Sequence, residues 1–290
     1  MAEPYRRSFR ELVTRYEFEP QLRDLYVEGE RDRFLLGWFF RGSHCNEVAI
    51  YPILSVEVPR ELLEQLRVFG NQGRVIALCK YLEEHLSVEA RNVLGLIDKD
   101  TTEFLGKPIR LRYLVTTDFA CLECYALSES TMDKFCRLYL GKLIEPDRMS
   151  ELLNILVELF VLRAAKQVVA SGAHWIDDFT RYCAVTGGKL YFDRETFVER
   201  LANASEGQLS KDALVAQFTE LLQERPRDIR QAINGHDLVR MLSWFAHEIG
   251  VPSPIYDAAP LHRALITSIE LEELNATPLF VKLVEWAKRT

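Results

Sequence analysis

The chain has 290 residues, of which 48% are hydrophobic and 27% are charged, and its formal net charge is −7. This composition is typical of a globular protein that can bury a sizeable core. No apolar run approaches the roughly 20 residues that a membrane span needs, and residues 1–7 lack the apolar core of a signal peptide. We therefore expect a cytoplasmic protein without membrane contact. The acidic balance disfavours a non-specific nucleic-acid coat, but leaves room for an enzyme that holds a structured nucleic acid through a local basic patch.

The first half of the sequence alternates between strand and helix character. Short apolar runs bounded by turn residues predict strands, and apolar residues at helical spacing predict helices. The predicted strands cover 23–28, 47–53, a run ending before Asp98, and 110–117, and the predicted helices cover 5–20, 30–41, 59–69 and 74–86. Pro52 indicates that strand 47–53 lies near a sheet edge, and Gly70 and Gly73 separate the last two helices. The apolar face of helix 30–41 is predicted to contain Phe34, Leu35, Trp38 and Phe39. This alternation predicts an α/β fold with a mostly parallel sheet flanked by helices.

The second half has a different character, because long apolar-periodic segments dominate it. Helices are predicted over 149–170, 212–222, 236–249, 261–274 and 278–288. Residues 172–207 are the least regular part and contain a predicted turn at Gly187 and Gly188. We therefore expect an α/β domain over 1–145 and a helical C-terminal region over 146–290, with self-association as a natural way to bury the apolar helix faces.

Six cysteines are too dilute in a chain of this length to predict a disulfide framework. Cys121 and Cys124 form a single C-x-x-C motif, and no second pair stands at the spacing that a zinc site would require. The pattern favours structural thiols and leaves redox or metal roles for this pair open.

Acidic residues follow two of the predicted strands where each strand ends. Glu28 closes the first strand, and Gly29 behind it is expected to allow a sharp turn. Asp98 and Asp100 follow a later apolar run, and alternation along an extended chain would point both to one side. If the two strands are parallel neighbours, these carboxylates meet at the edge where open α/β sheets bind ligands. Like charges held so close favour a cation between them, so the sequence predicts a magnesium site.

These motifs resemble the TOPRIM (topoisomerase–primase) family. The segments V-E-G-E-R-D and L-I-D-K-D, about 70 residues apart, are similar to the glutamate motif and the Asp-x-Asp motif of TOPRIM proteins. Glu28, Asp98 and Asp100 match the family's metal-binding acids, and Asp32 matches a further acidic position. Similarity to one subfamily, which includes AriB of the PARIS anti-phage system, extends to Thr116–Phe119 with Glu123 and to Gly235–Leu238. Cys124 departs from that subfamily, which tends to have Asn there.

The resemblance implies a TOPRIM nuclease that depends on Mg²⁺, with Mn²⁺ as a substitute. It implies catalytic roles for Glu28, Asp98 and Asp100, with Asp98 and Asp100 as metal ligands and Glu28 as a further ligand or the general base. Asp32 and Glu123 are expected to complete the ligand set, together with Asp118. By resemblance, the protein is a toxin effector in antiviral defence, an endonuclease that cuts RNA, with tRNA as the favoured substrate. An ABC-type ATPase sensor would hold it inactive, and the released form would be a homodimer.

Other interpretations remain open. A non-catalytic TOPRIM-like subunit could dock on an ATPase, although such a module need not keep all three acids. Another magnesium-dependent phosphoryl transfer acting on DNA, such as primase-like nucleotidyl transfer, is a third hypothesis; the absence of a recognisable zinc-binding or helicase module argues weakly against a primase. His236 and Asp237 are interpreted either as a catalytic pair or as helix-start residues that bond locally, and Glu30 as a first-turn helix residue.

Overall fold

A computed structural model of the protein describes residues 6–87, 90 and 92–289. Residues 1–5 lie outside this range. They include the start of the first predicted helix and most of segment 1–7, which the sequence predicts not to be a signal peptide. The chain forms two compact units: one consists of residues 1–99, 108–118 and 270–290, and the other of residues 100–107 and 119–269. This division differs from the single boundary near residue 145 that the sequence predicts, because the chain passes between the units several times.

The first unit is built on a parallel sheet of four strands in the order β3-β2-β5-β6. The strands are β2 (Arg23–Val27), β3 (Val48–Pro52), β5 (Val93–Ile97) and β6 (Leu114–Thr116). The α/β class with a parallel sheet is thus confirmed, and β3 lies at an edge, as Pro52 predicts. β6 is shorter than its predicted range. A separate parallel pair joins β1 (Arg7–Ser8) to β4 (Val56–Glu57).

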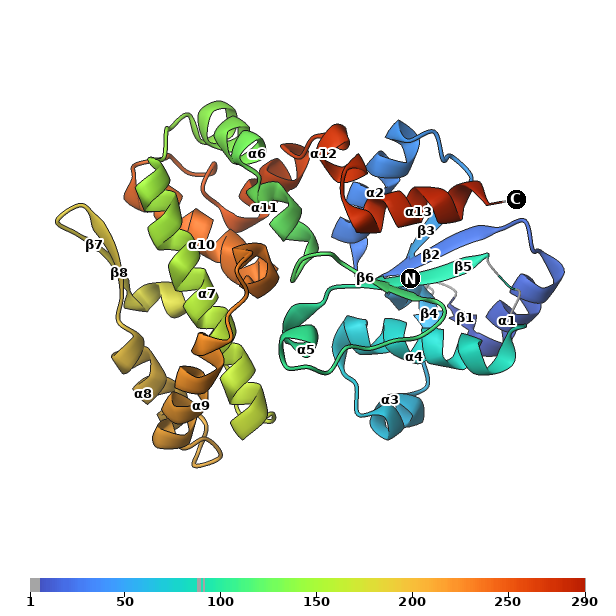
Figure 1. Ribbon diagram of the computed structural model, residues 1–290, viewed down its shortest axis with the longest axis horizontal. Coiled ribbons are helices and arrows are strands. Elements are labelled where there is room, and N and C mark those ends of the chain that lie inside the picture. The colour runs from blue at the N-terminus through green and yellow to red at the C-terminus, as the bar shows by residue number, and fades with distance from the viewer. Residues whose placement is uncertain (1–5, 88–89, 91, 290) are drawn as a thin grey trace, which may run out of the picture. The chain divides into compact units, whose positions relative to one another are not determined.

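Helices cover both faces of this sheet. They are α1 (Phe9–Phe18), α2 (Glu30–Gly42), α3 (Arg60–Leu66), α4 (Gly70–His85), α12 (Leu271–Asn275) and α13 (Pro278–Lys288), with a 3-10 turn η1 (Ile53–Ser55). Within this unit, α2 and α13 lie over one face of the sheet, and α1 and α4 lie over the other (Figure 1). The rings of Phe39 in α2 and Phe280 in α13 are 4.6 Å apart between centroids. The last helix of the chain therefore belongs to the core of the first unit.

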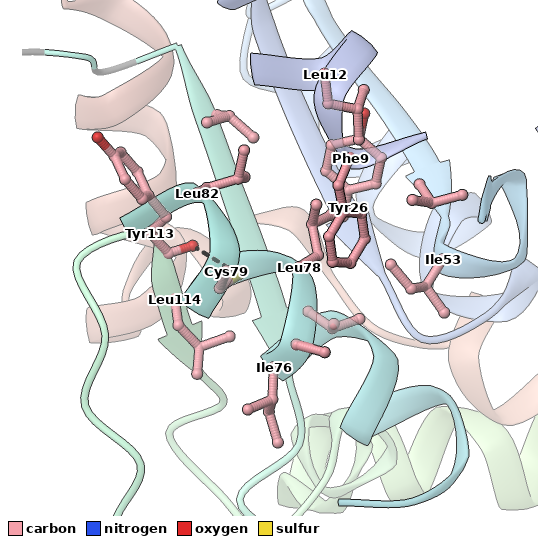
Figure 2. Close-up of a cluster of buried hydrophobic side chains, with 14 of the residues drawn as sticks. Phe9, Leu12, Tyr26, Ile53, Ile76, Leu78, Cys79, Leu82, Tyr113 and Leu114 are labelled. Atoms are coloured by element: carbon pink, nitrogen blue, oxygen red, sulfur yellow. Dashed lines mark hydrogen bonds between the residues drawn. The ribbon is translucent and has the colours of Figure 1, made fainter. Parts of the chain in front are cut away.

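The core beneath α1 and α4 contains Phe9, Leu12, Tyr26, Leu78 and other side chains that are almost fully buried (Figure 2). There, the Cys79 thiol of α4 donates a hydrogen bond to the Tyr113 carbonyl oxygen at 3.2 Å. Gly95 in β5 makes this packing possible, since a Cβ at that position would overlap the Cys79 sulfur. The apolar strand sequence V-L-G-L-I thus carries a glycine because α4 approaches the strand closely.

Two local predictions within the first unit are wrong in part. α2 buries Leu35, Leu36, Phe39 and Phe40, whereas Phe34 is 64% exposed and Trp38 is 40% exposed. The buried stripe is therefore rotated from the predicted one. Gly70 and Gly73 do not separate two helices but lie in the first turns of α4. Gly73 packs against the backbone of Val68, so close approach rather than a chain break explains it.

The second unit is mostly helical and contains one short hairpin. Its elements are α5 (Asp100–Phe104), η2 (Leu122–Leu127), α6 (Glu129–Lys134), η3 (Phe135–Leu140), α7 (Pro146–Val169), η4 (Phe179–Tyr182), β7 (Cys183–Thr186), β8 (Lys189–Phe192), α8 (Arg194–Ala204), α9 (Lys211–Gln223), η5 (Ile229–Ala232), α10 (Gly235–Glu248) and α11 (Ala258–Thr267). Gly187 and Gly188 form the hairpin turn with positive φ, as predicted. Helix α8 was not predicted, and the predicted helix 261–274 is two helices that belong to different units.

Throughout the part of the chain that the structure describes, every helix is too short or too polar to cross a bilayer.

Candidate functional site

The first unit brings Glu28 and Asp98 together at the carboxyl ends of two neighbouring strands. β2 pairs with β5 in parallel, with Asp24 opposite Val93 and Tyr26 opposite Gly95. Every residue of both strands is buried, so the two chains emerge from the core at the same edge. There, the backbone N–H of Asp98 donates a hydrogen bond to Glu28 Oε1 at 3.1 Å. The prediction that these strands are parallel neighbours is confirmed.

The peptide that follows β5 is held by groups from three directions. The Asp98 carbonyl oxygen accepts a hydrogen bond from the Gln72 side chain of α4 at 3.0 Å. The backbone N–H of Lys99 donates to Thr117 Oγ1 at 3.1 Å, and its ammonium group donates to the Asp118 carbonyl oxygen at 3.0 Å. This segment is therefore fixed by α4, by the end of β6 and by Glu28, as a binding edge requires.

Asp32 and Asp118 have structural contacts at helix N-termini. Asp32 Oδ2 accepts a hydrogen bond from the Gly29 N–H at 2.9 Å, which closes the first turn of α2. Both carboxylate oxygens of Asp118 lie 3.1 Å from the Leu279 N–H in the first turn of α13. Negative charge is favourable at both places because helix N-termini present unpaired N–H groups. The chain bends at Glu28 and Gly29 before α2, but Gly29 has extended backbone with φ −151°, so this bend does not need the conformational freedom of glycine.

Asp100 belongs to the second unit, and the strand alternation from which its direction was predicted does not reach it. β5 ends at Ile97, so strand alternation does not extend to these two residues. Asp100 begins α5 with φ 46°, and its N–H donates to the Ala120 carbonyl oxygen at 2.9 Å. A positive φ is uncommon outside glycine, although aspartate tolerates it better than most residues.

Glu123 forms a partly buried pair with His262 in the second unit. His262 Nε2 lies 2.9 Å from Glu123 Oε1, and the side chains are 4% and 18% exposed respectively. Burial alone would raise the pKa of the Glu123 carboxyl. Hydrogen bonding from His262, its charge and a hydrogen bond from the Cys121 thiol outweigh that effect and lower this pKa. Gly235 makes the arrangement possible, because a Cβ there would overlap Glu123 Oε2.

Sequence reasoning missed His262 and Gln72 as partners of the acidic residues. His262 lies 139 positions from Glu123, so no spacing rule connects them. Asp237 was considered with His236 as a catalytic pair. In the structure, its carboxylate instead binds the Arg163 guanidinium through two hydrogen bonds of 2.7 and 2.8 Å. The side-chain oxygen of Asn234 accepts the N–H of His236, as expected for a helix start.

The oxygen atoms at this edge of the sheet are of the kind that binds a hard cation. Glu28 and Asp98 offer carboxylate oxygens, and magnesium is commonly held by one or two carboxylates together with water and substrate phosphates. Among the described residues, no group of three or more His, Cys, Asp or Glu side chains is arranged as a metal cage. Glu28 and Asp98 are the residues at this edge that could hold such an ion.

A scan against protein-family models finds no match for this chain, and a search of curated proteins by sequence finds none either.

Proposed function

We propose that this protein is a magnesium-dependent TOPRIM-type nuclease that acts on RNA, with tRNA as the favoured substrate. The observation that carries the proposal is the 3.1 Å contact between the Asp98 N–H and Glu28 Oε1, which unites two carboxylate residues at one sheet edge. The parallel order of β2 and β5 and the motif resemblance point to the same chemistry. As in the similar subfamily, the nuclease would be a defence effector held inactive by an ABC-type ATPase and active as a homodimer.

Glu28 and Asp98 have distinct roles in this proposal. Glu28, held by the hydrogen bond from the Asp98 N–H, would be the general base that accepts a proton from an attacking water. The Asp98 carboxylate would hold the cation, with Asp100 as the second aspartate of the motif. A bound Mg²⁺, or Mn²⁺ in its place, would acidify water and neutralise charge on the phosphate. Asp32 would act through its charge at this edge.

The test compares Glu28→Gln with Glu30→Gln. Glu30 is two positions away in the first turn of α2 and pairs with Arg33 at 2.7 Å, which makes it a matched control. Each protein is expressed with and without the partner ATPase, and growth and RNA integrity are measured; purified proteins are assayed on tRNA with Mg²⁺ or EDTA. We expect Glu28→Gln to lower the cleavage rate by about 10²–10⁴-fold at unchanged thermal stability, and Glu30→Gln to retain activity.

Cleavage that persists in Glu28→Gln or in EDTA would contradict the proposal. Cutting of DNA alone would favour another phosphoryl-transfer enzyme acting on DNA. The second candidate function, a non-catalytic subunit of an ATPase complex, is favoured by one observation: Asp32 and Asp118 serve as acceptors at helix N-termini. It would be supported if neither protein cut RNA or DNA under any condition while both bound the ATPase equally.

A further inference from the structure

The C-x-x-C motif brings two thiols into contact inside the second unit. Cys121 and Cys124 are 2% and 0% exposed, and their sulfur atoms are 3.3 Å apart. A disulfide bond is about 2.05 Å long, so the sulfurs need to approach by little more than about 1 Å to become bonded. Both thiols lie within hydrogen-bonding distance of one acceptor, the Ile233 carbonyl oxygen, at 3.5 and 3.6 Å. This shared acceptor orients the two sulfurs toward the same point.

The Glu123 carboxylate lies next to the Cys121 thiol. Glu123 accepts a hydrogen bond from the Cys121 thiol, which is one of the contacts that keep this carboxyl ionised. Gly235 admits both groups, since a Cβ there would lie 3.1 Å from the Cys121 sulfur and 2.7 Å from Glu123 Cδ. The Cys121 thiol therefore packs closely against Glu123 and the start of α10.

Burial raises the pKa of three other cysteines of the chain. Burial raises the pKa of Cys136 to about 11 and that of Cys183 to about 12, which leaves both protonated at neutral pH. Burial also raises the pKa of Cys79, whose thiol donates to the Tyr113 carbonyl oxygen. Cys121 and Cys124 differ from these three thiols in that their sulfur atoms are in contact with each other.

We propose that Cys121 and Cys124 are an oxidation site at which hydrogen peroxide closes an intramolecular disulfide. The Cys121 sulfur attacks one peroxide oxygen, the O–O bond breaks, and the thiol proton joins the departing hydroxide to form water. The resulting sulfenic acid is attacked by the Cys124 sulfur; its S–O bond breaks, the S–S bond forms, and the second thiol proton leaves in another water. Two electrons pass from the two sulfurs to one peroxide. The small size of peroxide suits a site that is almost closed to solvent.

This inference goes beyond the proposed function and does not depend on it. Closing the disulfide removes both thiol hydrogens, so neither the Ile233 carbonyl oxygen nor Glu123 can then accept a hydrogen bond from these cysteines. The oxidation state of the pair is thereby linked to the contacts that η2 makes with the start of α10 and with His262.

The test is peptide mapping of the folded, full-length protein after exposure to hydrogen peroxide. Remaining thiols are alkylated on unfolding, and the protein is cleaved at Lys and Arg. Residues 113–134 then form one peptide that contains Cys121 and Cys124 and no other cysteine. We expect this peptide to lose two hydrogen masses, to escape alkylation, and to regain both thiols with dithiothreitol. Cys121→Ser should abolish the change, while Cys183→Ser, the matched control, should retain it.

The proposal is overturned if peroxide modifies other cysteines first, or if Cys121 proceeds to sulfinic acid without a disulfide. It is also overturned if the disulfide forms only after unfolding. Stoichiometric zinc in the purified protein, with both thiols unreactive until a chelator removes it, would assign the pair to metal binding instead. Because the measurement is made on the wild-type chain, an unstable variant does not obscure the result.

Discussion

The Glu123–His262 pair provides a pH-dependent contribution to stability at the scale of single residues. The contacts of Glu123 lower its pKa below the usual value of 4.5, so the folded protein binds this proton less readily than the unfolded chain does. The contribution is therefore fully present above the unfolded pKa and is lost as pH falls through the lower, folded value. We expect Glu123→Gln to lower the free energy of unfolding by about 2 kcal/mol at pH 7, as for hydrogen bonds to charged groups.

This pH-dependent contribution of Glu123 is measured by thermal melts of wild type and Glu123→Gln between about pH 3 and pH 8. The difference between the two proteins should be constant near neutrality and should shrink at acidic pH. The exposed Glu199→Gln serves as a control that should leave the melting temperature nearly unchanged. A difference that is independent of pH across the whole range would show that Glu123 acts through packing and not through its charge.

Individual residues also show why the candidate site was predicted only in part. The proximity of Glu28 and Asp98 followed from the rule that parallel strands end at a common edge. The contact between Asp118 and Leu279 could not be predicted, because it depends on where a helix that starts 160 residues later comes to lie. Asp32 was different: a helix that starts after Gly29 with an acid at its third position is a visible capping signal. Asp32 was instead assigned to the metal site, because its position matches an acidic residue of the TOPRIM motif.

At the scale of elements, Gly95 determines how closely α4 packs on β5. A Cβ at this position would overlap the Cys79 sulfur and lie 2.7 Å from Val75 Cγ1. We expect Gly95→Ala to destabilise the protein by about 1–3 kcal/mol, the usual cost of overpacking a core. Adding Cys79→Ala should recover part of this loss, as a double-mutant cycle by denaturant unfolding would measure.

Gly37→Ala is the matched control for Gly95→Ala. Gly37 lies in α2, where a Cβ would make only ordinary contacts at 3.7 Å or more, so alanine should be neutral or stabilising by about 0.5–1 kcal/mol. Equal effects of both substitutions would contradict the close packing of α4 on β5.

Most elements were predictable where periodicity and end signals agree. The helix Pro278–Lys288 matches its predicted bounds because proline at its start and continuous apolar spacing mark it clearly. Helix α8 was missed although Asp193 caps it and Phe197, Val198 and Leu201 form its buried stripe. Glycines misled the prediction at α4, since tertiary packing and not a turn requires Gly73. Local sequence patterns predict single helices and strands well, but they predict close packing contacts poorly.

At the scale of the whole molecule, the first unit depends on a segment from the far end of the chain. α13 buries Phe280 against Phe39 of α2, and its first turn binds Asp118. The Arg23 guanidinium also donates to the Arg289 carbonyl oxygen just beyond α13. A sequence boundary near residue 145 would separate the sheet from this helix. These contacts join residues that are remote in sequence. The return of α13 to the first unit could therefore not be predicted from hydrophobic periodicity.

We therefore expect residues 1–118 alone to lack a cooperative thermal transition, whereas residues 1–118 joined to 270–290 by a flexible Gly/Ser linker should unfold cooperatively. Circular dichroism and near-ultraviolet spectra during heating measure the difference. Phe280→Ala in the joined protein should cost about 3–5 kcal/mol, because it removes a fully buried ring from that interface. A cooperative transition of equal midpoint without residues 270–290 would mean that α13 covers a sheet that is already stable. In that case the sheet edge that carries Glu28 and Asp98 would form before the chain returns to it.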